Sequence, residues 1–167
     1  IRPGDTVFVG QGCGEPLTLS TALVAQRHDL KDVTVLLFTV MSDTFRPEHA
    51  DALRFRATAV TSGTRALAAS GAMDIVPTHY GDSDRLAADG DLRADVVMVQ
   101  VRAPDASGRV TLGASHDASL ALLPRARCVI AEINRRAPAV RAEHTLALSD
   151  FDAIVEVDRP LVESRRR

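Results

Sequence analysis

A glycine-rich stretch near the N-terminus has the residue types and spacing of an anion-binding loop. The apolar run of residues 7–9 passes into a segment with glycine at positions 10, 12 and 14, and Pro16 then opens a helical pattern. Glycine allows positive φ angles and leaves the backbone bare, so N–H groups before a helix can approach a negative oxygen. A tight turn that binds nothing is the alternative. The predicted ligand-binding residues of this stretch are Gly10, Gln11, Gly12, Gly14, Glu15 and Pro16.

Other ligand-binding motifs do not fit. The dinucleotide fingerprint G-x-G-x-x-G does not fit, because Glu15 stands where the third glycine is required. The acidic residue expected at the end of the second strand is also missing, since Phe38 is followed by Thr39, Val40 and Met41. No phosphate loop is present, and Lys31 is the only lysine of the chain. A nucleophile elbow, G-x-S-x-G, is also missing. The histidines at positions 28, 49, 79, 116 and 144 lack metal-ligand spacing, so no metal site is predicted.

Polar residues at the ends of apolar runs are further candidates. Glu132 lies inside the run 128–133, either as a buried carboxyl with a raised pKa near a site or as an exit residue paired with an arginine. Asn134 follows at the carboxyl end, where parallel sheets carry functional residues. Ser115 is the expected N-cap of a helix. Cys13 is interpreted as a small filler of the glycine-rich stretch rather than a nucleophile.

The hydrophobic pattern predicts a single α/β domain over residues 1–167. Runs 33–38, 94–101 and 128–133 are continuously apolar, which indicates strands buried on both faces of a mainly parallel sheet. Shorter strands are expected at 7–9, 53–60, 73–77, 110–112, 144–148 and 153–157, and helices at 16–28, 65–70, 82–88 and 115–126. Strands alternating with helices predict an open sheet with helices on both faces.

Composition narrows the function classes. Aromatic residues make up 4% of the 167 residues and the net charge is −2, so neither a base-stacking surface nor a nucleic-acid partner is expected. No apolar run has the length of a bilayer span, so no membrane partner is expected. Two distant cysteines favour reduced thiols and a cytoplasmic location. The start at Ile1 without methionine suggests a domain of a longer protein.

Several segments together resemble one family. They are residues 1–10 with Gly14-Glu15-Pro16, residues 71–79, residues 94–101 with 104–113, and residues 126–134 with Pro138. In this order they resemble the N-terminal half of the acetyl-CoA hydrolase/transferase family, which includes 4-hydroxybutyrate and acetate CoA-transferases. The similarity extends along essentially the whole chain.

The resemblance implies a two-lobed enzyme with the fold of the NagB, RpiA and CoA-transferase type. In such enzymes a glutamate of the C-terminal half attacks an acyl-CoA, so no catalytic nucleophile is expected in this chain. Residues 10–16, the turn at Gly108, Ser115 and Asn134 would then line one wall of the acyl cleft. A coenzyme A thioester would be a substrate, with no permanently bound cofactor. Implied partners are the C-terminal CoA-transferase domain, an acyl-CoA, a small carboxylic acid and further copies of the chain.

Two other functions stay open at the sequence level. The glycine-rich stretch could serve a stand-alone regulatory module that binds a small carboxylate or coenzyme A. A sugar-phosphate isomerase-like enzyme is disfavoured because no lysine-bearing phosphate cradle exists. Arg135 and Arg136 depart from the family pattern beside the expected acyl pocket, so the acyl group is undetermined, as is the choice between transferase and hydrolase.

Overall fold

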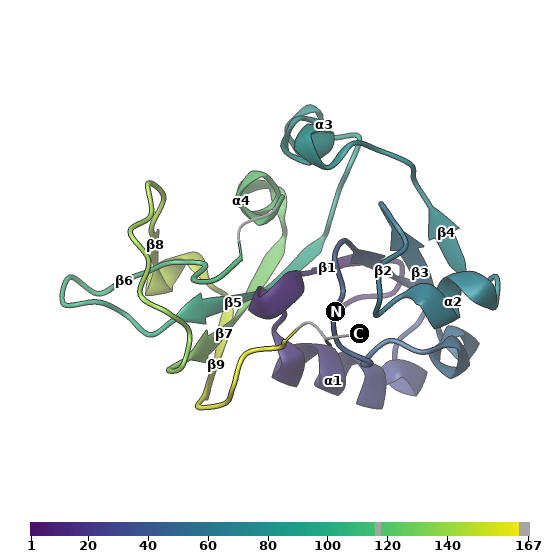
Figure 1. The fold of residues 1–167 in the computed structure, drawn as a ribbon, viewed down its shortest axis with the longest axis horizontal. Helices are drawn as coiled ribbons and strands as arrows, with labels where there is room; N and C mark the ends of the chain where they lie inside the picture. Colours follow the sequence, from purple (N-terminus) through teal and green to yellow (C-terminus); the bar gives the residue numbers. More distant parts are fainter. Residues whose placement is uncertain (116–117, 164–167) are drawn as a thin grey trace.

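A seven-stranded parallel sheet forms the centre of the protein (Figure 1). The computed structural model describes residues 1–115 and 118–163. The strand order is β4-β3-β2-β1-β5-β7-β9, and every neighbouring pair is parallel. The strands are β1 (Thr6–Val9), β2 (Val33–Leu37), β3 (Leu53–Ala57), β4 (Met73–Ile75), β5 (Val96–Arg102), β7 (Cys128–Asn134) and β9 (Ala153–Val157). Strands β6 (Arg109–Val110) and β8 (Leu146–Ala147) form a separate antiparallel pair.

Helices cover both faces of the sheet, as the sequence predicts. The helices are α1 (Leu17–Ala25), α2 (Arg65–Ala69), α3 (Ser83–Asp89) and α4 (Ser119–Leu122). One core cluster joins Leu23 of α1 and Leu67 of α2 to Val7 of β1. The other joins Ala87 of α3 and Leu122 of α4 to Phe8. Since neighbouring residues of a strand point to opposite faces, each central strand must be apolar throughout to serve both clusters.

Local sequence explains most of the shorter elements. Strand β3 alternates between buried and exposed residues, which is the pattern of a half-buried strand. Residues 39–52, between β2 and β3, contain one 3-10 turn, η3 (Pro47–Asp51). The other 3-10 turns are η1 (Gly12–Gly14), η2 (Arg27–Asp29), η4 (Tyr80–Asp82), η5 (Leu123–Arg125) and η6 (Leu148–Asp150).

The helix expected over residues 115–126 is shorter than predicted. Helix α4 begins only at Ser119, with Ala118 at its N-cap, so the expected N-cap role of Ser115 is wrong. At the other end Pro124 lies in η5, because proline lacks the N–H that would continue an α-helix.

The strand order reverses between β1 and β5, and this position decides where a ligand can bind. From β1 the chain proceeds outward through β2, β3 and β4, and then returns to β5 on the other side of β1. Connections leave such a pair in opposite directions, which opens a crevice at the carboxyl ends of the two strands. Residues 10–16, called the glycine loop below, directly follow β1 and so begin at this crevice.

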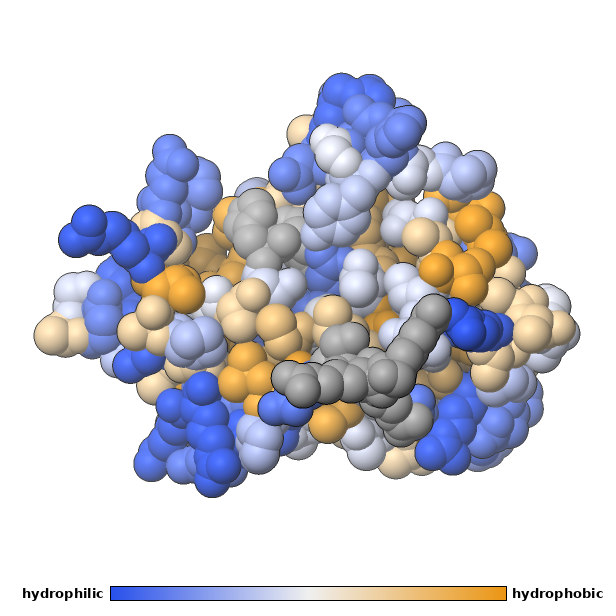
Figure 2. Space-filling model, viewed as in Figure 1, coloured by the Kyte–Doolittle hydropathy of each residue, from blue (hydrophilic) through white to orange (hydrophobic). Residues whose placement is uncertain are grey.

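The molecular surface is mixed in character. Figure 2 shows hydrophobic residues exposed over the β4 region, and Ile75 and Val76 of that region are 47% and 39% exposed. Within the described part of the chain, no helix has the length and apolarity of a membrane span.

A matched pair of leucines tests the position of the core. Leu36 of β2 is 1% exposed and belongs to a core cluster, whereas Leu148 is 38% exposed. We expect Leu36→Ala to lower the free energy of unfolding by about 3 kcal/mol, because it leaves a cavity among rigid neighbours. Leu148→Ala should change it by less than about 1 kcal/mol. Urea denaturation of both variants measures the difference, and equal losses would contradict the assigned core.

Candidate functional site

Four N–H groups of the glycine loop donate hydrogen bonds within the protein. Gly10 donates to the carbonyl of Met98 (2.9 Å), and Gly12 donates to the carbonyl of Thr39 (2.7 Å). Gly14 and Glu15 donate to carbonyls inside the loop, at 3.0 and 3.3 Å. These bonds fix the loop between β5 and the end of β2. The sequence predicts bare N–H groups that face a ligand, but these four donors are already occupied.

The start of α1 does hold an anion, and that anion belongs to the protein. The backbone N–H groups of Thr18 and Leu19 donate to Oε2 of Glu132, at 2.8 and 3.3 Å. Unpaired N–H groups and the helix dipole both favour negative charge at this end of a helix. Glu132 is completely buried in β7, so its carboxylate satisfies these donors without reaching solvent.

Arg159 neutralises the Glu132 carboxylate. Its Nε donates to Oε1 of Glu132 at 3.0 Å, and its Nη2 forms an ion pair with the same oxygen. The same Nη2 donates to the backbone carbonyl of Glu15 at 3.2 Å. The expected pairing of Glu132 with an arginine is therefore confirmed, as is its burial, but Glu132 lies inside β7 and is not the exit residue of the strand.

A second buried chain of hydrogen bonds supports the glycine loop from behind. Asn134 is fully buried, and its Nδ2 donates to Oε1 of Gln100 (2.9 Å) and to the carbonyl of Arg159 (3.0 Å). Gln100 in turn donates from Nε2 to the carbonyl of Cys13 at 3.3 Å. Asn134 Oδ1 accepts from the N–H of Arg136 at 3.0 Å. The side chain of Asn134 is thus directed into the protein, where it supports the glycine loop.

Glu15 is a buried carboxyl with incomplete hydrogen bonding. It is 1% exposed, and its Oε1 accepts from the hydroxyls of Ser42 (2.7 Å) and Ser20 (3.3 Å). Its Oε2 has no hydrogen-bond partner among the described residues. Burial raises the pKa of the Glu15 carboxyl, while hydrogen bonds from Ser42 and Ser20 and the nearby charge of Arg159 oppose that rise. The fold therefore favours the protonated form of Glu15 more than water does.

Gln11 fixes the other side of the loop. Its Oε1 accepts from the N–H of Thr39 at 2.9 Å, and its Nε2 contacts the hydroxyl of Tyr80. Gln11, Gly12 and Thr39 thus join the end of β1 to the end of β2.

Close packing against Ser115 explains one glycine of the loop. A Cβ on Gly14 would lie 2.8 Å from the Cβ of Ser115, which is closer than such atoms approach. Gly12 has a φ of +61°, and its ideal Cβ position lies 3.5 Å from the Ser115 hydroxyl. Ser115 therefore does adjoin the glycine loop, although it does not cap a helix.

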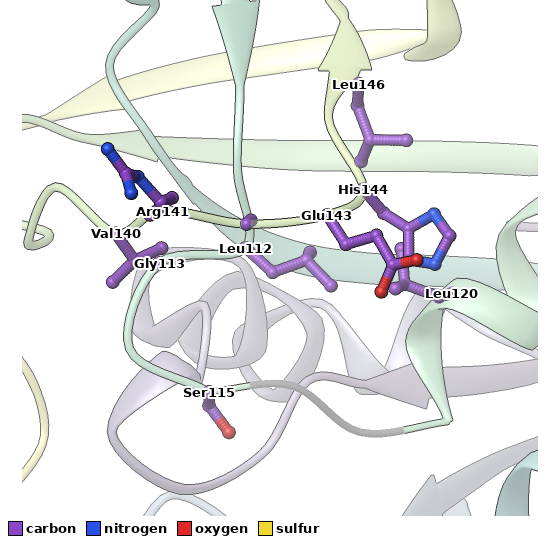
Figure 3. Close-up of a pocket in the computed structure, with 10 residues that line it drawn as sticks. Leu112, Gly113, Ser115, Leu120, Val140, Arg141, Glu143, His144 and Leu146 are labelled. Atoms are coloured by element: carbon purple, nitrogen blue, oxygen red, sulfur yellow. The ribbon is translucent and has the colours of Figure 1, made fainter.

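A pocket of about 370 Å³ opens beside this contact (Figure 3). Figure 3 shows Glu143 and His144 extending toward Leu120, whereas Arg141 points to the opposite side. Ser115 and Leu112 line both this pocket and a small hollow at Gly10 and Gly14. The pocket residues are Leu112, Gly113, Ser115, Leu120, Val140, Arg141, Ala142, Glu143, His144 and Leu146.

Gly108, which is also predicted to line the cleft, lies away from the glycine loop and does not line the pocket. It ends a turn with its N–H donating to the carbonyl of Asp105, and no described atom lies within 4 Å of its ideal Cβ position. The turn precedes β6, away from the glycine loop (Figure 1). Within residues 1–115 and 118–163, no three histidine, cysteine, aspartate or glutamate side chains gather to hold a metal ion.

Sequence reasoning missed several residues of the site. Gln100 could have been found from the sequence, because it is a polar residue inside an apolar run. In the structure it pairs in register with Glu132 of the neighbouring strand. Arg159, Ser42 and Tyr80 lie far along the chain from their partners in the glycine loop, and nothing in their local sequence marks them.

Two glycines test the close packing of the loop. We expect Gly14→Ala to destabilise the protein by about 2 kcal/mol, because the new methyl group overlaps Ser115. Apart from its two chain neighbours, no described residue has an atom within 4 Å of the ideal Cβ position of Gly81, so Gly81→Ala should change stability by less than about 1 kcal/mol. Thermal unfolding measures both changes. A neutral Gly14→Ala variant would contradict the close approach.

Glu15→Gln tests the buried carboxyl. A raised pKa in the fold means that protonated Glu15 contributes stability below its ordinary pKa of 4.5, and this contribution is lost as pH rises through the folded-state value. Glutamine does not titrate, so the stability of Glu15→Gln relative to the unaltered protein should increase from pH 4.5 toward neutral pH. Urea denaturation over that range measures the trend.

Glu156→Gln is the matched control, since the Glu156 side chain is 62% exposed. We expect no comparable trend for this variant. A Glu15→Gln variant whose relative stability falls with rising pH would show that the ionised form is favoured in the fold.

Comparison with known proteins places this arrangement in a family. A sequence model described as the acetyl-CoA hydrolase/transferase N-terminal domain matches residues 1–163. The 4-hydroxybutyrate coenzyme A transferase of Clostridium kluyveri is 30% identical over 165 residues, which are 98% of this chain and 38% of that protein. The succinyl-CoA:cyclohexane-1-carboxylate CoA transferase of Geobacter metallireducens is 26% identical over 96% of this chain and 37% of its own length.

Solved structures give the same result. RipA from Yersinia pestis matches with a TM-score of 0.89 and 30% identity, over 100% of this chain and 42% of that one. The 4-hydroxybutyrate CoA-transferase of Porphyromonas gingivalis matches with a TM-score of 0.74 and 26% identity, over 97% of this chain and 37% of that one. The chain therefore spans about two fifths of the length of the relatives it matches. With its parallel sheet, its glycine loop and the match over residues 1–163, the chain belongs to the acetyl-CoA hydrolase/transferase family, as an N-terminal domain.

Proposed function

We propose that this domain forms one wall of the active-site cleft of an acyl-CoA:carboxylate CoA-transferase or acetyl-CoA hydrolase. The observation that carries the proposal is the place of the glycine loop. In a chain of this family, the loop follows β1 at the point where the strand order reverses, and Ser115 joins it to a pocket of about 370 Å³. Crevices at this position are where open α/β sheets bind ligands.

The proposed chemistry is transfer of coenzyme A between two carboxylic acids. A glutamate outside residues 1–167, in a C-terminal domain, attacks the thioester carbonyl and releases coenzyme A as a thiolate, which leaves a mixed anhydride. The thiolate then attacks the glutamyl carbonyl and releases the first acid, which leaves a glutamyl thioester. A second carboxylate, or water in a hydrolase, then completes the turnover and restores the glutamate.

In this scheme, the residues of this domain bind and orient the substrate. Leu112, Leu120 and Leu146 give the pocket apolar sides that suit an acyl chain, and Ser115 lies where the pocket meets the loop. Gln11 and Gly12 hold the loop beside β2. Asn134 and Glu132 support the loop from within the protein and do not contact the substrate.

Reduction of the covalent intermediate tests the proposal. We expect the natural full-length protein to transfer coenzyme A from acetyl-CoA to a short carboxylic acid, and residues 1–167 alone to be inactive. Sodium borohydride should abolish the activity when acetyl-CoA is present, because hydride reduces a glutamyl thioester to an alcohol but leaves a free carboxylate unchanged.

The control is borohydride without acetyl-CoA, which should leave the activity intact. Isotope-labelled acceptor acid separates transfer from hydrolysis, since only transfer places the label in a new thioester. If the full-length protein showed no turnover while residues 1–167 bound coenzyme A or a short acid in calorimetry, a binding or regulatory module would replace this proposal.

A further inference from the structure

Arg159 connects the segment after β9 to the glycine loop and to the start of α1. It lies two residues after the end of β9. Its guanidinium contacts Glu132 of β7 and the backbone carbonyl of Glu15. Its own backbone carbonyl accepts from Asn134 Nδ2 at 3.0 Å, and its N–H donates to Asn134 Oδ1 at 3.4 Å.

Two chains of contacts lead from Arg159, one to the start of α1 and one to the loop. The first passes through the Glu132 carboxylate to the N–H groups of Thr18 and Leu19, at the start of α1. The second passes through Asn134 and Gln100 to the carbonyl of Cys13, in the middle of the loop. The direct bond to Glu15 lies between the two end points. Arg159 is therefore connected to the loop at two places, Cys13 and Glu15, and to the start of α1 at a third.

The Arg159–Glu132 ion pair is much more buried than an ion pair formed by residues of the same strands. Arg159 is 19% exposed and Glu132 is 0% exposed at the side chain. Arg135 and Glu156 pair across the ends of β7 and β9 at 3.1 Å, but their side chains are 66% and 62% exposed. Water screens the exposed pair, whereas the buried pair acts in a low dielectric and has little freedom to rearrange.

We propose that Arg159 is a positioning residue that sets the conformation of the glycine loop and thereby couples the segment after β9 to the active-site cleft. This inference rests on the proposed function for its catalytic consequence. A displacement of the segment after β9 moves the Arg159 guanidinium, and the start of α1 and the loop move with it. Lysine cannot replace this arrangement, because a single ammonium group does not reproduce the planar fork that reaches Glu132 and the Glu15 carbonyl together.

The test compares Arg159→Met and Arg159→Lys with the matched control Arg135→Met in the natural full-length protein. The first measurement is hydrogen exchange of the Thr18 and Leu19 amides. We expect these amides to exchange at least about tenfold faster in Arg159→Met, because their acceptor Glu132 loses its partner. The amides of β2 should exchange at an unchanged rate. Arg135→Met should leave all of these amides within about twofold of the unaltered protein.

The second measurement is steady-state kinetics of coenzyme A transfer. We expect Arg159→Met to lower kcat by about tenfold or more, with KM for the thioester within about threefold, because a displaced loop misaligns bound substrate. Arg159→Lys should fall between Arg159→Met and the unaltered protein. Arg159→Lys keeps the positive charge, so it still tests the inference if Arg159→Met does not fold.

Two results would overturn the inference. One is unchanged exchange at Thr18 and Leu19 in both Arg159 variants. The other is a lowered melting temperature with kcat unchanged, which would make the ion pair merely structural. If the unaltered protein transfers no coenzyme A, the proposed function fails. Faster exchange at Thr18 and Leu19, with the β2 amides unchanged, would then still support the positioning by Arg159 of the start of α1, which directly follows the loop.

Discussion

The buried ion pair between Glu132 and Arg159 is the interaction on which the rest of the site depends. An isolated carboxylate inside the sheet would be very unfavourable, since burial removes its hydration. Here the carboxylate has a guanidinium on one oxygen and two helix N–H groups on the other. The Glu132 carboxylate also accepts hydrogen bonds from the otherwise unpaired N–H groups at the start of α1. One side chain thus provides hydrogen-bond partners for both the Arg159 guanidinium and the helix terminus. The C-terminal end of the loop, at the start of α1, is consequently held against β7.

Three buried polar residues of the sheet lie toward the carboxyl ends of β5 and β7. Gln100 and Glu132 are paired in register on β5 and β7, and Asn134 ends β7. Toward the other end, these strands present the apolar side chains that both helical layers need. The polar network therefore lies directly behind the crevice at β1 and β5, where open α/β sheets bind ligands. A rigid, satisfied network at this position holds the loop without exposing its own charges to the crevice.

The sequence predicted the sheet better than the site, for a physical reason. Burial on two faces requires continuous apolar runs, so β2, β5 and β7 could be recognised from local pattern alone. The contacts of the glycine loop are long-range: Arg159 and Glu15 are 144 positions apart. Local sequence also cannot show that the loop's N–H groups find protein carbonyls, or that Asn134 turns inward. Both outcomes depend on neighbours contributed by other strands.

The occupied donors of the loop constrain the proposed reaction. Attack on a thioester develops negative charge on oxygen, and donors aimed at that oxygen are usually a large part of the catalytic effect. The N–H groups of Gly10, Gly12, Gly14 and Glu15 cannot serve, because each already donates to a protein carbonyl. In the proposed reaction, stabilisation of the oxyanion would then come from groups other than these four donors. The contact with Ser115 explains Gly14 and the φ of +61° explains Gly12, so these two glycines serve the close packing of the loop.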